Sequence, residues 1–164
     1  MQDDAIVERA KHAILNMALG DVKKASAGGA KMGAFILAAC VIDYLACLYA
    51  GHDSNATIFR DFVRQFFDDK RYDPDDLWDA IRCKLLHSYT VKEGKYAYTD
   101  NNPQLHFKQD KSGRTYINLE DFVSAVERAA HNYFALVECD PQVRCRLIKR
   151  IKSVGILTVF EPEF

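Results

Sequence analysis

The sequence predicts a mainly α-helical fold: a helical bundle of about five or six helices with a small antiparallel β insertion at about residues 95–117. Three observations predict it. Apolar residues recur at helical spacing through most of the chain. Two Asp-Pro pairs, which begin at Asp73 and Asp140, are typical of helix starts, because aspartate caps a helix and proline suits its first turn. From Lys95 the apolar spacing changes to a period of two, which is typical of strands.

The composition predicts one globular domain over residues 1–164. Hydrophobic residues make up 49% of the chain and charged residues 27%, which is the composition of neither a disordered nor a membrane-embedded protein. Because the net charge is −1, any contact with nucleic acid needs a local basic patch. The five cysteines form no Cys-x-x-Cys pair, which predicts reduced thiols, and the acidic start resembles no signal peptide. Both features indicate a cytoplasmic protein.

The first two predicted helices fill the N-terminal third of the chain. The first begins at Asp3 or Asp4 and ends in a glycine-containing stretch. The second covers about residues 30–49 and ends at Gly51. It is apolar on nearly every side, so we expect it to be central. Asp43 interrupts an apolar run that is short for a membrane span, so we expect a buried core helix and no membrane contact.

Four further helices are predicted from their capping residues. The expected starts, in chain order, are Ser54 or Asn55, Asp73, Asn118 and Asp140. The fourth helix is expected to reach about Ser88, and the sixth to end near Gly155. The insertion lies between the fourth and fifth helices, with expected strands at Tyr96 and Tyr98, Leu105 and Phe107, and Tyr116. Its aromatic residues could stack on bases, but the apolar side of a small sheet is the favoured interpretation.

The residues best suited to chemistry are an arginine and a histidine on the fourth helix, in Arg82-Cys-Lys-Leu-Leu-His87. A guanidinium can hold a phosphate and balance the charge that develops on it, and an imidazole can move a proton near neutral pH. Together they can cleave RNA without a metal. The spacing alone is weak, because about one Arg-x4–6-His match is expected by chance among ten arginines and five histidines.

The predicted fourth helix has apolar residues on more than one face. At helical periodicity one face holds Leu77, Trp78, Ile81, Leu85 and Tyr89, with Arg82 at its edge. His87 points nearly opposite, and Cys83 and Leu86 also lie outside the first face. A homodimer interface would explain this second apolar surface, and so would a bundle that wraps around the helix.

These residues resemble the HEPN superfamily, all-helical domains that carry Arg-x4–6-His near the end of a late helix. The resemblance covers mainly residues 30–51 and 74–90. It implies a homodimer whose motifs share a cleft, metal-independent RNA cleavage in active members, and a possible role in stress or phage defence. Arg82 would then bind phosphate, and His87 would transfer a proton or contact the phosphate. Cys83 stands where many active members carry a polar residue, and other members are inactive binding modules. A catalytically inactive protein-interaction module is therefore the alternative.

Asp43 is the charged residue most in need of an explanation, because an unpaired carboxylate inside an apolar helix is costly. In one interpretation it orients Arg82 in the cleft. In the favoured alternative it has a structural ion pair or hydrogen bond elsewhere in the core, or lies at the edge of the helix.

The sixth helix carries the one dense basic cluster, Arg144, Arg146, Lys149, Arg150 and Lys152. It could guide RNA electrostatically, although a solvated helix face is the more common role of such a cluster. The remaining histidines have no ligand spacing with one another or with cysteine, and helix capping explains most of the acidic residues at 73–79. The sequence therefore predicts no metal and no cofactor.

Overall fold

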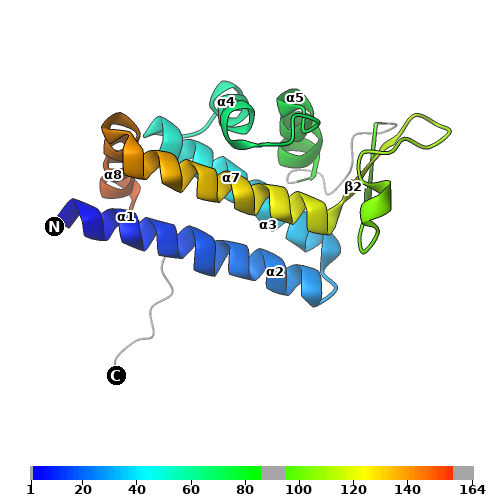
Figure 1. The fold of residues 1–164 in the computed structure, drawn as a ribbon, viewed down its shortest axis with the longest axis horizontal. Coiled ribbons are helices and arrows are strands. Elements are labelled where there is room, and N and C mark those ends of the chain that lie inside the picture. The colour runs from blue at the N-terminus through cyan, green and yellow to red at the C-terminus, as the bar shows by residue number, and fades with distance from the viewer. Residues whose placement is uncertain (1, 86–94, 157–164) are drawn as a thin grey trace.

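The protein is described from a computed structural model, which defines residues 2–85 and 95–156. Its N-terminal third begins with three helical segments that join without a break, α1 (Gln2–His12), η1 (Ala13–Ala18) and α2 (Leu19–Ala27). Figure 1 shows them as one long helix beside α7 (Leu119–Cys139). The middle segment of this long N-terminal helix, η1, is π-helical. The helix ends next to Gly28 and Gly29, inside the stretch that the sequence marked as a break.

Helix α3 (Lys31–Ala50) is central, as the sequence predicted. It packs against α2, α4 (Ala56–Phe66), η2 (Leu77–Leu85), α7 and α8 (Pro141–Val154). It ends at Gly51, which has a φ of 80° and lies against the Arg146 backbone, where a side chain would not fit. By length and composition α3 could also cross a membrane, but a core helix meets the same criterion. Half of its most apolar stretch is buried inside this protein.

The next two helices begin at the predicted caps. The Asn55 side chain accepts a hydrogen bond from the backbone N–H of Ile58 (3.0 Å) and starts α4 (Ala56–Phe66). Asp73 accepts from the backbone N–H groups of Asp75 and Asp76 and starts α5 (Pro74–Asp76), which continues into the π-helical η2 (Leu77–Leu85). The predicted end of this helix near Ser88 lies outside the described residues.

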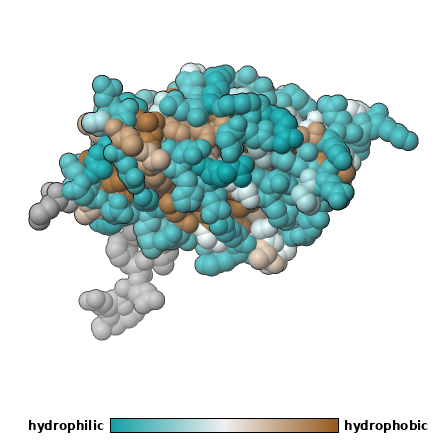
Figure 2. Space-filling model, viewed as in Figure 1, coloured by the Kyte–Doolittle hydropathy of each residue, from teal (hydrophilic) through white to brown (hydrophobic). Residues whose placement is uncertain are grey.

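Two further helices complete the bundle. Helix α7 (Leu119–Cys139) runs beside α3, and Asp140 caps α8 (Pro141–Val154), which ends at Gly155 as predicted. The side chains of α7, α4 and α3 form an aromatic cluster of Tyr133, Tyr49, Phe62 and Phe66, with ring centroids 4.7–6.5 Å apart. The face shown in Figure 2 is mostly hydrophilic, with patches of hydrophobic surface between the hydrophilic side chains.

The prediction of an antiparallel insertion was wrong. Strands β1 (Tyr96–Thr99) and β2 (Thr115–Asn118) pair in parallel, with Tyr96 opposite Thr115. Parallel strands need a long crossover, and residues 100–114 provide one. This crossover takes up the residues expected to form the middle strand, because Leu105 lies in η3 (Pro103–Leu105) and Phe107 has a left-handed φ of 61°. Antiparallel pairing is limited, within residues 95–156, to one bridge between Gln109 and Thr115.

His106 joins this insertion to the bundle. Its Nδ1 accepts the backbone N–H of Asn118 (3.1 Å), and its Nε2 lies 3.1 Å from the hydroxyl of Tyr72. A neutral imidazole that accepts at Nδ1 carries its proton on Nε2, so Nε2 donates to Tyr72. Asn118 was predicted to cap α7, but its side chain instead donates to Asp121 and accepts from the backbone of Asn102.

We expect the stability of the protein to fall below neutral pH because of His106. Burial lowers the pKa of this histidine below its ordinary value of 6.5, and protonation of Nδ1 would remove the acceptor for Asn118. The unfolded chain then binds more protons than the folded chain, so the contribution of His106 is complete above pH 6.5 and is lost as pH falls.

Urea unfolding at a series of pH values from 7.5 to 5 checks this prediction. The free energy of unfolding should fall less steeply for His106→Asn, whose amide oxygen can replace Nδ1, than for the wild type. His52→Asn, at an exposed histidine, controls for the loss of one imidazole. Identical slopes for His106→Asn and the wild type would contradict the prediction.

Candidate functional site

Arg82 lies near the end of η2, where its guanidinium contacts the side chains of Trp78 and Asp43. Its Cζ lies 4.7 Å from the centroid of the Trp78 ring, within the range of a cation–π interaction. Its Nη2 donates to Oδ2 of Asp43 on α3 at 3.3 Å. The side chains of Arg82 and Asp43 are 25% and 26% exposed, so this pair lies at the surface and not inside the core.

The structure shows Arg82 as an ion-pair partner of the part-exposed Asp43. That this contact orients Arg82 in a shared cleft stays a prediction. Asp43 lies between the buried residues Ile42 and Leu45, and its Oδ1 is buried with no hydrogen-bond partner among the described residues. The single contact at 3.3 Å is long for a charged pair. Asp43 therefore positions Arg82 without enclosing it.

Trp78 also contacts a second arginine, which the sequence analysis did not consider. The Cζ of Arg60, on α4, lies 6.0 Å from the Trp78 ring centroid, and Nε of Arg60 pairs with Oδ1 of Asp75 at 2.6 Å. Phe59 packs edge-on against the same indole, with centroids 5.4 Å apart. No local pattern connects α4 with η2, so only the packing of the two helices brings Arg60 and Arg82 to one tryptophan.

Two cysteines lie near this site. Cys83 follows Arg82 and is half-buried. Cys40, one helical turn before Asp43, lines an apolar groove of about 310 Å³ together with Met17, Leu37 and Tyr44. Burial raises the pKa of the Cys40 thiol, the charge of Asp43 raises it further, and Arg82 lowers it. The thiol therefore stays protonated near neutral pH and is a poor nucleophile.

The structure does not place the whole predicted motif. His87, Leu86 and Tyr89 lie outside the described residues, so the relation of His87 to Arg82 stays a prediction. Arg82, Asp43 and Cys83 are described, and the structure brings the first two into contact.

The basic cluster of α8 is largely paired within the chain. Arg144 pairs with Asp4 (2.5 Å), Arg150 with Asp53 (2.5 Å) and Lys152 with Asp3 (2.7 Å). Arg146 donates to the backbone carbonyl of Tyr49 at 2.6 Å, and Lys149 is exposed. The aspartates of α1 and of the loop after α3 therefore balance much of the positive charge of the basic cluster that the sequence analysis considered for RNA binding.

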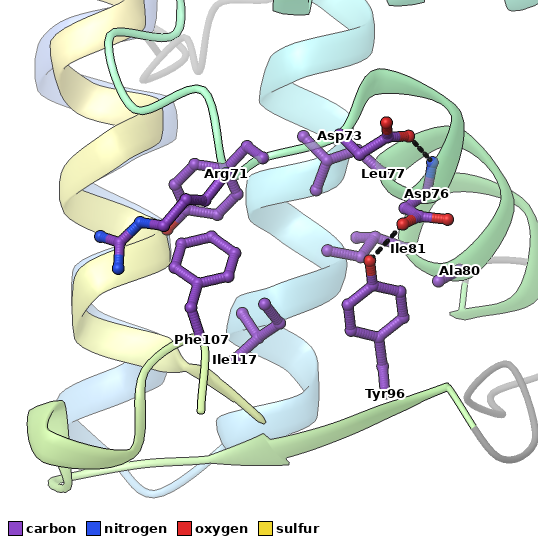
Figure 3. A pocket seen from close by; sticks show the side chains of 10 residues that line it. Arg71, Asp73, Asp76, Leu77, Ala80, Ile81, Tyr96, Phe107 and Ile117 are labelled. Atoms are coloured by element: carbon purple, nitrogen blue, oxygen red, sulfur yellow. Dashed lines mark hydrogen bonds between the residues drawn. The ribbon is translucent and has the colours of Figure 1, made fainter. Parts of the chain in front are cut away.

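The cavity between the insertion and η2 is too small for a substrate. Its volume of about 10 Å³ is at most enough for one water molecule. Figure 3 shows Tyr96 beneath Asp76, with its hydroxyl donating to Oδ2 (2.5 Å), and Phe107 beside Arg71. Lys95 pairs with the same carboxylate. These contacts fasten the insertion to the start of the helix that carries Arg82.

Within residues 2–85 and 95–156, no three His, Cys, Asp or Glu side chains lie close enough together to hold a metal ion. Asp73 serves as a helix cap, as the sequence indicated.

Comparison of the chain with protein-family models, with curated proteins and with solved structures finds no match.

We expect the Arg82–Asp43 pair to stabilise the fold only modestly. A part-exposed ion pair with one long contact is worth about 1 kcal/mol or less. In a double-mutant cycle of Arg82→Ala and Asp43→Ala, followed by urea unfolding, the coupling energy should therefore be about 1 kcal/mol at most. The exposed pair Arg64–Asp61 on α4 provides the matched cycle. A coupling of several kcal/mol for Arg82 and Asp43 would show that the pair is a structural requirement of the core.

Proposed function

We propose that this protein is a HEPN-like homodimer that binds RNA and cleaves it without a metal, in the manner that its sequence resemblance implies. The observation that carries the proposal is the state of Arg82. Its guanidinium is fixed by Trp78 and oriented by Asp43, while a quarter of the side chain stays exposed. An arginine held in this way can bind a phosphate oxygen with little loss of side-chain entropy.

In the proposed reaction, the 2′-hydroxyl oxygen of RNA attacks the adjacent phosphorus. His87 takes part in transferring the 2′-hydroxyl proton or in protonating the 5′-oxygen that leaves. The bond between phosphorus and the 5′-oxygen breaks, and the products are a 2′,3′-cyclic phosphate and a 5′-hydroxyl. Arg82 balances the negative charge that builds up on the phosphate oxygens.

A second candidate function has its own support. Asp43 already occupies Arg82, and a guanidinium engaged by a carboxylate can be purely structural. In that case the protein is a catalytically inactive helical interaction module, and substitution of Arg82 affects folding instead of RNA turnover.

The proposed cleft needs two chains, so we expect a homodimer in solution. Sedimentation equilibrium at micromolar concentration should give about twice the 18.7 kDa of one chain. Leu86→Asp should shift the population towards monomer, because it would bury a charge in the interface. The matched control is Leu37→Asp, at the exposed Leu37 on α3. A wild type that is monomeric throughout would remove the shared cleft.

We expect Arg82→Ala and His87→Ala each to reduce RNA cleavage by a factor on the order of 10²–10⁴, which is typical for loss of a general acid–base or of an oxyanion stabiliser. Arg64→Ala on α4 is the matched control and should cut like the wild type. A chelator should not change the rate. Cleavage that stops with chelator, or an RNA pool that the wild type leaves uncut, would contradict the mechanism. Unfolding of Arg82→Ala would favour the interaction module.

A further inference from the structure

Two arginines from different helices share one tryptophan beside the candidate site. Arg60 on α4 and Arg82 on η2 place their Cζ atoms 6.0 and 4.7 Å from the Trp78 centroid. The two guanidinium carbons are therefore no further apart than the sum of these distances. Each arginine is also held by a carboxylate from a neighbouring element, Asp75 for Arg60 and Asp43 for Arg82.

We propose that Arg60 is a second phosphate contact, and that Arg60 and Arg82 together hold the backbone of single-stranded RNA. This inference rests on the proposed function. It adds a residue outside the predicted motif, and it makes Trp78 the residue that positions both guanidiniums. The RNA contact is then a two-arginine clamp that spans α4 and η2.

The exposures show how the phosphate would enter. The side chains of Arg60 and Arg82 are each 25% exposed, whereas that of Asp75 is 63% exposed. A carboxylate that is mostly in water binds its arginine weakly, because solvent screens the pair. A phosphodiester can replace Asp75 on Arg60, and the released carboxylate becomes hydrated again. The planar guanidinium suits the phosphate oxygens at least as well as it suits a carboxylate.

The indole keeps both guanidiniums in place during this exchange. Phe59 packs edge-on against Trp78 and fixes the orientation of the ring. The cation–π contacts do not depend on the carboxylates, so each arginine keeps its contact with the indole when an anion replaces its aspartate. Trp78 thus reduces the entropy that the arginines lose on binding RNA.

The charges at the clamp balance in the absence of RNA, because each arginine has an aspartate. The site therefore recruits phosphate by exchange of partners and not through a broad positive field. Few phosphates are contacted, so the dependence of affinity on salt should be shallow, with a slope of about 0.7 for each phosphate on single-stranded nucleic acid.

Trp78 is the one tryptophan in the sequence, so its fluorescence reports directly on the clamp. The probe is a single-stranded 2′-O-methyl RNA oligonucleotide, which binds like RNA but lacks the nucleophilic 2′-hydroxyl. Titration of the full-length protein should change Trp78 emission. Arg60→Ala should weaken binding about tenfold or more and lower the salt slope by about 0.7. Arg64→Ala, one turn further along α4, should bind like the wild type.

Substitution of Asp75 provides a second test, in which the affinity for RNA should rise instead of fall. Asp75→Asn removes the competing carboxylate and should tighten binding several-fold, whereas Asp61→Asn, beside the control arginine, should not. Thermal unfolding monitors the fold of each variant. If Arg60→Ala does not fold, Arg60→Lys takes its place, and it should weaken binding less but in the same direction, because lysine lacks the planar fork.

The clamp is overturned if the oligonucleotide leaves Trp78 emission unchanged, or if Arg60→Ala and Asp75→Asn both bind like the wild type. Cleavage of ordinary RNA by the same variants separates this failure from failure of the proposed function. RNA cut normally by Arg60→Ala would remove the clamp and leave the nuclease. An oligonucleotide bound through Arg60, combined with RNA that no variant cuts, would keep the clamp and remove the nuclease.

Discussion

The burial of α3 is the constraint on which the rest of the structure depends. Beyond Lys31 at its start, this helix carries a single charged residue, Asp43, and helices pack on it from several sides. A helix with so much apolar surface must be covered on nearly every side to be stable in water. The cover comes from α2, α4, α7, α8 and η2, and it leaves the carboxylate of Asp43 only a narrow choice of partners.

This constraint also explains why Arg82 lies where it does. The η2 helix places the Arg82 guanidinium next to Asp43, which partly offsets the cost of holding this carboxylate beside apolar residues. In η2, Leu77, Ile81 and Leu85 are buried against the core, while Arg82 stays at the edge and reaches Asp43. A π-helical turn is rare and is often found at functional sites. The same geometry that satisfies the core therefore presents a guanidinium at the surface.

The sequence predicted the helices well because capping and helical periodicity depend only on residues a few positions apart in the chain. Asn55, Asp73, Asp140 and Gly51 act where the sequence placed them. The failures came from interactions between distant segments. Strand direction in the insertion depends on the crossover at residues 100–114, whose Phe107 packs edge-on against Tyr72. The α8 basic residues meet Asp3 and Asp4 from the opposite end of the chain.

The candidate site shows the same contrast between local signals and contacts that join distant segments. Periodicity placed Arg82 at the edge of an apolar face and identified Asp43 as a charge that needs a partner, but it left that partner open. Arg60 was not considered because α4 and η2 share no sequence pattern. Only the packed structure brings it to Trp78. The π-helical form of η2 was not predicted, but Leu77, Ile81 and Leu85 are buried together, as the helical periodicity indicated.

Three of the five α8 cations, Arg144, Arg150 and Lys152, pair with aspartates within the chain, so α8 presents less unpaired positive charge than its sequence suggests. Surface ion pairs hold α8 to α1 and to the loop after α3, so most of these charges are engaged in the fold. What distinguishes the arginines beside Trp78 is the way they are restrained. An aromatic ring keeps each guanidinium in place without neutralising it, whereas a carboxylate that is partly in water can be replaced by another anion. In the proposed clamp, specificity would come from the geometry of two restrained guanidiniums and not from net charge, in a chain whose overall charge is −1.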